Sequence, residues 1–149
     1  MIALDKTKTY LIDLDGTMYR GNQVIEEAVA FIRLLQKHHV SYVFVTNNAT
    51  RTKKQNLAHM EHLGFSGIKE ADFFTSATAA VSYMKKHSNE HYVYAVGEQG
   101  LYEAINEGGY EIDKHKAKLV FVGLAHDMDY QSYSEAARIL RQNHALLIG

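Results

Sequence analysis

Short apolar runs alternate with helix-period segments along the whole chain, and this alternation restricts the fold more than any other feature of the sequence. The runs are rich in β-branched and aromatic residues and end at polar residues or Gly, as β-strands do. They cover residues 10–12, 42–45, 73–75, 92–96, 119–122 and 145–148. Strands separated by helices build parallel sheets from successive βα units. The sequence therefore predicts an α/β protein with a parallel sheet.

The segments between these runs are predicted to be amphipathic helices. They cover residues 26–38, 52–63, 78–87, 99–107 and 130–143. In the first, the apolar stripe at i, i+3, i+4 and i+7 consists of Ala28, Phe31, Ile32 and Leu35. In the last, the predicted stripe consists of Tyr133, Ala136, Ala137 and Leu140. We expect Asp129 to cap the last helix at its N-terminus and Gly64 to end the second in a left-handed conformation.

Composition argues against several classes of protein. Lys and Arg number 16 and Asp and Glu 17 in 149 residues, so the chain lacks the basic excess that nucleic-acid binding needs. No run approaches the ~18 consecutive apolar residues of a membrane span. Cys is absent, which excludes disulfides and thiolate chemistry. The N-terminus has no signal-peptide pattern, so we expect a cytoplasmic protein without nucleic-acid or membrane partners.

The chain stops directly after an apolar run, at Gly149. A strand at this position needs neighbours that are already formed, and a sheet that lacks later strands leaves open edges. We therefore expect a C-terminally truncated chain that could form homo-oligomers.

Two carboxylates follow the first predicted strand, in the sequence Asp13-Leu14-Asp15-Gly16-Thr17. Ligands of parallel α/β sheets bind beyond the carboxyl ends of the strands. At i and i+2 the carboxylates can flank one bound group, with Asp13 attacking phosphorus and Asp15 acting as acid and base. A hard cation is implied because the pair repels a phosphate ester, and carboxylates suit Mg²⁺. Gly16 would let backbone N–H groups approach the phosphate.

This motif also has simpler interpretations than the catalytic one. A calcium loop that began at Asp13 would need Gly at its sixth position and Glu at its twelfth, where the chain has Met18 and Val24. A plain turn, with Asp and Gly serving as turn formers, stays open as an alternative.

A second polar group, Thr46-Asn47-Asn48, follows the second predicted strand. One hydroxyl and two amides can donate hydrogen bonds to phosphate oxygens. The alternative is that these residues only begin the helix that follows, since Thr and Asn are common helix caps.

The two motifs, separated by one helix, resemble those of the haloacid dehalogenase (HAD) superfamily of phosphatases, and most closely its NagD-like, para-nitrophenyl-phosphatase branch. The strings Phe74-Thr75-Ser76-Ala77, Val96-Gly97-Glu98 and Val122-Gly123-Leu124 are similar to that branch too. The resemblance implies a partial Rossmann-like core with a parallel sheet in residues 1–77. It also implies part of an inserted α/β cap domain in residues 78–149.

The same resemblance implies roles for individual residues. Asp13 would be the nucleophile and a magnesium ligand, and Asp15 the acid/base, with its backbone carbonyl on the metal. Thr46 and Asn47 would bind the phosphate, with Asn48 beside them. The family also uses a later Lys and a later acidic pair, and no counterpart is visible before Gly149. We interpret Asp127 and Asp129 as loop and helix-cap residues.

The function predicted from these residues is a Mg²⁺-dependent phosphatase that hydrolyses a small phosphorylated metabolite through an aspartyl phosphate. A sugar phosphate, a nucleotide or an aryl phosphate would be the substrate. The alternative is a non-catalytic or barely active fragment that only binds phosphate or metal, or self-associates. A signalling receiver domain is disfavoured, because its acceptor Asp would end the third strand, where the chain has Phe73-Phe74-Thr75.

Overall fold

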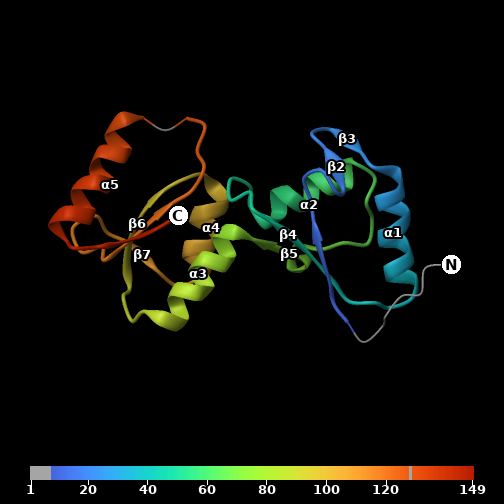
Figure 1. Ribbon diagram of the computed structural model, residues 1–149, viewed down its shortest axis with the longest axis horizontal. Coiled ribbons are helices and arrows are strands. Elements are labelled where there is room, and N and C mark those ends of the chain that lie inside the picture. Colours follow the sequence, from blue (N-terminus) through green and yellow to red (C-terminus); the bar gives the residue numbers. More distant parts are fainter. Residues whose placement is uncertain (1–7, 128) are drawn as a thin grey trace. The chain divides into compact units, whose positions relative to one another are not determined.

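The computed structural model describes residues 8–127 and 129–149, which form two compact units (Figure 1). The first contains the chain up to Asn47 together with Lys53–Thr75, and the second contains Asn48–Thr52 together with Ser76–Gly149. The predicted α/β class is confirmed, and every predicted strand and helix is present with bounds that differ by at most two residues. In the described part of the chain, no helix combines the length and apolarity that crossing a membrane requires.

The first unit is built on a parallel sheet with strand order β1-β4-β5. Its strands are β1 (Tyr10–Asp13), β4 (Tyr42–Thr46) and β5 (Phe73–Thr75). Ile12, Phe44 and Phe73 lie side by side across the three strands. They form one buried cluster with residues of α1 (Glu26–Lys37) and α2 (Lys53–His62). Both helices therefore cover the same face of this sheet.

Three short elements of the first unit were not predicted. These are the antiparallel hairpin of β2 (Tyr19–Arg20) and β3 (Gln23–Val24) and the 3₁₀ turn η1 (Glu70–Asp72). A two-residue strand has no measurable periodicity, so sequence pattern cannot identify it.

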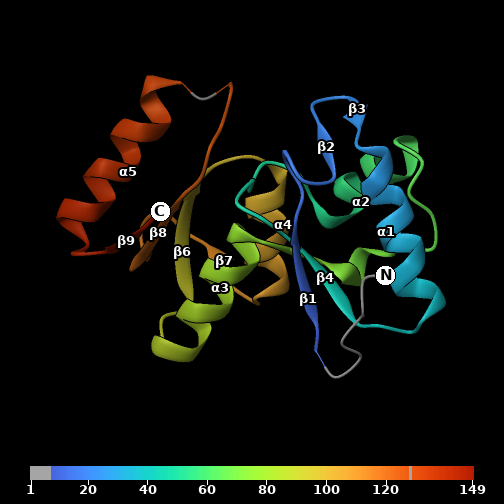
Figure 2. The ribbon, with the colours of Figure 1, turned by 45° about the vertical axis from the view of Figure 1, so that its right-hand side comes forward.

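The second unit contains a parallel sheet with strand order β7-β6-β8-β9. Its strands are β6 (Tyr92–Val96), β7 (Glu111–Ile112), β8 (Leu119–Val122) and β9 (Leu146–Ile148). Helices α3 (Ser76–His87) and α4 (Gln99–Glu107) lie on one face and α5 (Tyr130–Gln142) on the other (Figure 2). Because both faces are covered, β8 is apolar at every position instead of alternating.

Helix α5 corrects one prediction and confirms another. Its buried residues are Ala136 and Ile139, whereas Ala137 is exposed and Tyr133 is 44% exposed. The predicted stripe was therefore wrong at these two positions, because i, i+3 spacing allows neighbouring stripes and only packing chooses between them. The predicted cap is confirmed, since Oδ1 of Asp129 accepts a hydrogen bond from the backbone N–H of Ser132 at 2.9 Å.

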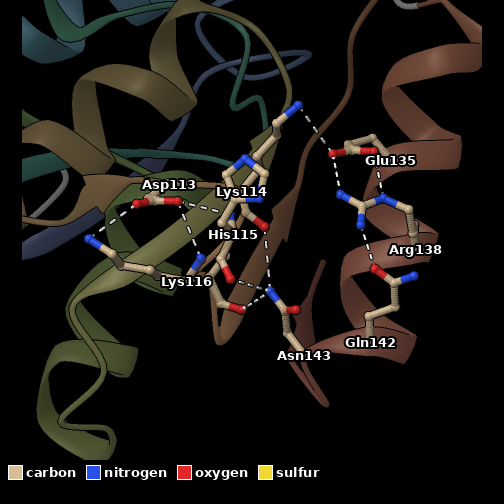
Figure 3. Close-up of polar contacts among 9 residues, drawn as sticks. Asp113, Lys114, His115, Lys116, Glu135, Arg138, Gln142 and Asn143 are labelled. Carbon is tan, nitrogen blue, oxygen red and sulfur yellow. Dashed lines mark hydrogen bonds and ion pairs between the residues drawn. The ribbon is translucent and has the colours of Figure 1, made fainter.

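The end of α5 is tied to the loop between β7 and β8 through Asn143 (Figure 3). Its Nδ2 donates to the carbonyl oxygens of Ala117, His115 and Lys114 at 3.1, 3.3 and 3.4 Å. The ammonium group of Lys118 donates back to the carbonyl oxygen of Asn143 at 2.7 Å. These contacts hold the point from which the chain enters β9.

Candidate active site

The first motif lies at the carboxyl end of β1, in a turn that the hydrophobic core holds in place. Leu14 and Met18 are 1% and 2% exposed. The carbonyl oxygen of Leu14 accepts hydrogen bonds from the N–H groups of Thr17 and Met18 at 3.2 and 2.8 Å. Gly16, between Leu14 and Met18 in the sequence, has a φ of +85°, a conformation that strains any residue with a Cβ atom. The turn is therefore anchored on both sides of its exposed residues.

The carboxylates of this turn face away from the core. Successive side chains of an extended chain point to opposite sides, and Ile12 and Leu14 are buried, so Asp13 and Asp15 are exposed. The hydroxyl of Thr17 lies 3.5 Å from Oδ2 of Asp13, at the long limit of a hydrogen bond. Thr17 was part of the motif but not of the predicted site, and the structure adds it beside Asp13.

The second motif begins on the strand next to the first. Asp13 pairs with Val45 in the parallel register of β1 and β4, so Thr46 is the next residue along the neighbouring strand. Thr46 is 7% exposed, and Asn47 is exposed. Within the first unit, the structure thus brings the carboxyl end of β1, with its two carboxylates, beside the end of β4.

Asn48 belongs to a different packing environment from Asn47. It begins the segment Asn48–Thr52, which clusters with the second unit. Its Oδ1 accepts hydrogen bonds from the backbone N–H of Thr50 at 2.8 Å and from the Thr50 hydroxyl at 2.7 Å. The amide plane of Asn48 therefore has a defined orientation, with the oxygen turned toward Thr50 and the nitrogen, which can only donate, on the other side.

The capacity of the site for a metal rests on Asp13 and Asp15. Among residues 8–127 and 129–149, no group of three or more His, Asp or Glu side chains could hold a metal ion. Magnesium is commonly bound by one or two carboxylates, with waters and substrate phosphate oxygens completing its octahedron. Two exposed carboxylates on an anchored turn fit that pattern.

Polar residues also gather at the strand ends of the second unit. Oε1 of Glu98, after β6, accepts hydrogen bonds from the backbone N–H and the Nδ1 of His126, after β8, at 2.8 and 2.6 Å. These hydrogen bonds hold the pKa of Glu98 below its ordinary value. The sequence analysis did not pair these residues. No sequence pattern could have paired them, because the tertiary structure decides that β6 and β8 are neighbours in the sheet.

Comparison with known proteins identifies the family. The pattern of the haloacid dehalogenase-like hydrolases matches residues 10–111. The 5'-nucleotidase YutF of Bacillus subtilis is 37% identical over 134 residues, which are 90% of this chain and 52% of that protein. The acid sugar phosphatase of Staphylococcus haemolyticus is 33% identical over 136 residues, 91% of this chain and 51% of that protein.

Solved structures show the same similarity. A double mutant of the thermostable NPPase from Geobacillus stearothermophilus aligns with a TM-score of 0.83 and 37% identity, covering 95% of this chain and 55% of that one. The chain thus spans about half the length of the proteins it matches. The predicted resemblance to the NagD-like branch is confirmed. On the evidence of its motifs, its fold and this match over residues 10–111, the chain belongs to the haloacid dehalogenase-like hydrolase family.

Proposed function

We propose that this chain carries the nucleophile and part of the phosphate-binding site of a Mg²⁺-dependent phosphatase for small phosphorylated metabolites. The observation that supports this most directly is the exposed pair Asp13 and Asp15, held at the carboxyl end of β1 beside the end of β4. Relatives named as a 5'-nucleotidase and an acid sugar phosphatase indicate nucleotides and sugar phosphates as the first substrates to test.

In the proposed reaction, the carboxylate of Asp13 attacks phosphorus and the ester P–O bond breaks. The carboxyl group of Asp15 gives its proton to the leaving oxygen, which departs as an alcohol. Asp15 then takes a proton from water as the water attacks the aspartyl phosphate. The products are inorganic phosphate and regenerated Asp13.

Binding of the phosphate would use residues at both strand ends. The hydroxyl of Thr46 and the side-chain amides of Asn47 and Asn48 can donate to phosphate oxygens, and Gly16, which has no side chain, would let the phosphate approach the turn closely. The carboxylate of Asp13 and the backbone carbonyl of Asp15 would hold Mg²⁺, which when bound reduces the repulsion between the charges of these residues and the phosphate.

The two compact units suggest how these roles are divided. We assign residues 1–77 to the catalytic core and residues 78–149 to part of the cap. The boundary between β5 and α3 supports this assignment, because the two units separate between Thr75 and Ser76.

A second candidate function is binding without turnover. It is favoured by the metal capacity of the described residues, which offer two carboxylates and no third acidic or His ligand beside them. Loss of one group that stabilises the transition-state charge commonly costs on the order of 10²–10³ in rate. A chain limited to these groups would bind phosphate with Mg²⁺ and release little product.

The test measures phosphate release from p-nitrophenyl phosphate, a nucleoside 5'-monophosphate and a sugar phosphate, with Mg²⁺ and with EDTA. Asp13→Asn should abolish the Mg²⁺-dependent release. Asp127→Asn makes the same chemical change at an exposed loop residue and should leave it intact. Equal release by the wild type and Asp13→Asn would refute the proposal. Phosphate binding seen by ³¹P NMR without any release would establish the second candidate instead.

A further inference from the structure

The loop that follows β4 packs its backbone against the first turn of α4. The N–H of Gly100 donates a hydrogen bond to the carbonyl oxygen of Thr50 at 3.0 Å. A Cβ atom at position 100 would lie 2.3 Å from the carbonyl oxygen of Arg51 and 2.6 Å from that of Ala49. Gly100 and residues 48–52 belong to the same compact unit. The approach is thus a backbone-to-backbone contact that only a glycine permits.

The atoms at this contact cannot yield as a side chain would. Carbon atoms and their non-bonded neighbours normally stay roughly 3.5 Å apart, so a Cβ at position 100 would push the loop and the helix apart by about 1 Å. Gly97, nearby in the same unit, differs because its Cβ would meet the flexible Leu101 side chain at 2.6 Å. At Gly123 a Cβ would find ordinary contacts, at 3.6 Å from Leu101 and 3.7 Å from Ala49.

The same short loop sets the orientation of Asn48. The two donors to its Oδ1 are the backbone N–H and the hydroxyl of Thr50, whose carbonyl oxygen is bound by Gly100. Thr50 is 8% exposed, so this arrangement is enclosed. A displacement of residues 49–51 therefore moves the group that orients the Asn48 amide.

We propose that Gly100 is a positioning residue for phosphate binding, acting through Thr50 on the amide of Asn48. This inference rests on the proposed function, in which Asn48 donates to the phosphate. Gly100 itself touches no substrate. The glycine keeps the loop backbone close to α4, and the loop then presents the Asn48 nitrogen in one orientation.

The test compares Gly100→Ala with Gly123→Ala in the full chain. Two readouts are followed by NMR: exchange of the Thr50 amide proton and the side-chain NH₂ signals of Asn48. A titration with inorganic phosphate and Mg²⁺ gives the affinity. In Gly100→Ala we expect faster Thr50 exchange, shifted Asn48 signals and phosphate affinity weakened roughly three- to tenfold, the loss of about one hydrogen bond. Gly123→Ala should match the wild type in all three.

A second pair of variants covers the case in which Gly100→Ala does not fold. Thr50→Val removes the hydroxyl that bonds Asn48 at nearly constant shape, and Thr50→Ser retains a hydroxyl. Phosphate affinity should fall in Thr50→Val and be close to that of the wild type in Thr50→Ser. The unfolding transitions of the two variants are compared to check that both are folded.

The outcomes separate this inference from the proposed function. Unchanged Thr50 exchange and Asn48 signals in a folded Gly100→Ala would overturn the positioning role. A displaced loop with wild-type phosphate affinity would overturn its link to binding, as would equal affinity in Thr50→Val and Thr50→Ser. If the wild type binds no phosphate, the proposed function fails and with it the link to binding, while exchange and Asn48 signals still decide whether Gly100 sets the loop.

Discussion

One carboxylate oxygen of Glu98 accepts two hydrogen bonds from His126, one from the backbone N–H and one from the imidazole Nδ1. The residues are 28 positions apart in the sequence. The pair joins the loop after β6 to the loop after β8, at the carboxyl edge of the second sheet. Its bonds lower the pKa of Glu98, which makes the contact a contributor to pH-dependent stability.

The contribution of Glu98 to the stability of the fold should therefore be lost at acid pH. Because its pKa is lower in the folded than in the unfolded chain, the carboxylate stabilises the fold above the ordinary value of 4.5, and this contribution is lost as the pH falls through the folded-state pKa. The difference in unfolding free energy between wild type and Glu98→Gln should be largest near neutral pH and shrink below about pH 4.5. Urea titrations across this range measure it. A difference in unfolding free energy that does not change with pH would contradict this role of Glu98. In a His126→Ala background the difference should be smaller.

Asp15→Asn should separate the two chemical steps in an active form of the enzyme. The proposed nucleophile Asp13 remains, so a substrate with a good leaving group should still form the aspartyl phosphate. Loss of the acid/base slows turnover by typically ~10²–10⁴-fold, and hydrolysis should lag behind phosphorylation. Rapid quench with a labelled aryl phosphate, followed by mass mapping, should find label on Asp13. Label on another residue would show that the nucleophile is wrongly assigned.

Gly16→Ala should cost both stability and phosphate binding. With φ at +85° and no atom within 4 Å of the added Cβ, the cost comes from backbone strain alone, about 1 kcal/mol. Gly109→Ala is the matched control, with φ at +75° and equally open surroundings. Both variants should lose similar unfolding free energy in urea. Only Gly16→Ala should weaken phosphate affinity. An equal loss of phosphate affinity in both variants would show that Gly16 is not part of the phosphate-binding site.

Asn143→Ala should destabilise the second unit by about 1 kcal/mol, because the substitution removes Nδ2 and leaves carbonyl oxygens of the β7–β8 loop without their hydrogen-bond donor. Gln142→Ala, one residue earlier, removes an exposed side chain that bonds Arg138 (Figure 3) and should stay within about 0.5 kcal/mol of the wild type. Thermal unfolding followed by circular dichroism compares the two. Equal losses of stability in the two variants would show that the hydrogen bonds of Asn143 to the β7–β8 loop contribute little.

Self-association should involve the exposed strand β9. Leu146 and Leu147 are 56% and 55% exposed and point to opposite faces of the sheet. Exposed apolar edge strands favour pairing with other chains, and charged residues oppose it. The double change Leu146→Lys and Leu147→Lys should therefore lower the apparent mass at high concentration in light scattering. A monomeric wild type under the same conditions would contradict the expectation.

The spacing of apolar residues predicted much of the fold, because the burial of each strand or helix determines that spacing. The apolar run of β8 and the i, i+4 stripe of Ala28 and Ile32 in α1 reflect burial against a sheet or a helix, and burial selects residue types at fixed spacing. The spacing of apolar residues did not predict elements that are too short to show a period, such as β2 and β3. It also failed where two stripes are equally apolar, as at Ala137 and Ile139 of α5.

For this protein, the sequence alone was sufficient for the α/β class, the order of its longer strands and helices and the place of Asp13 and Asp15 at the end of the first strand. Those features follow from propensity and periodicity within about ten residues. The contacts of Glu98 with His126 and of Gly100 with Thr50 depend instead on which strands become neighbours and how closely a loop approaches a helix. Such contacts join distant parts of the chain and leave no periodic trace, so packing of the whole unit had to define them.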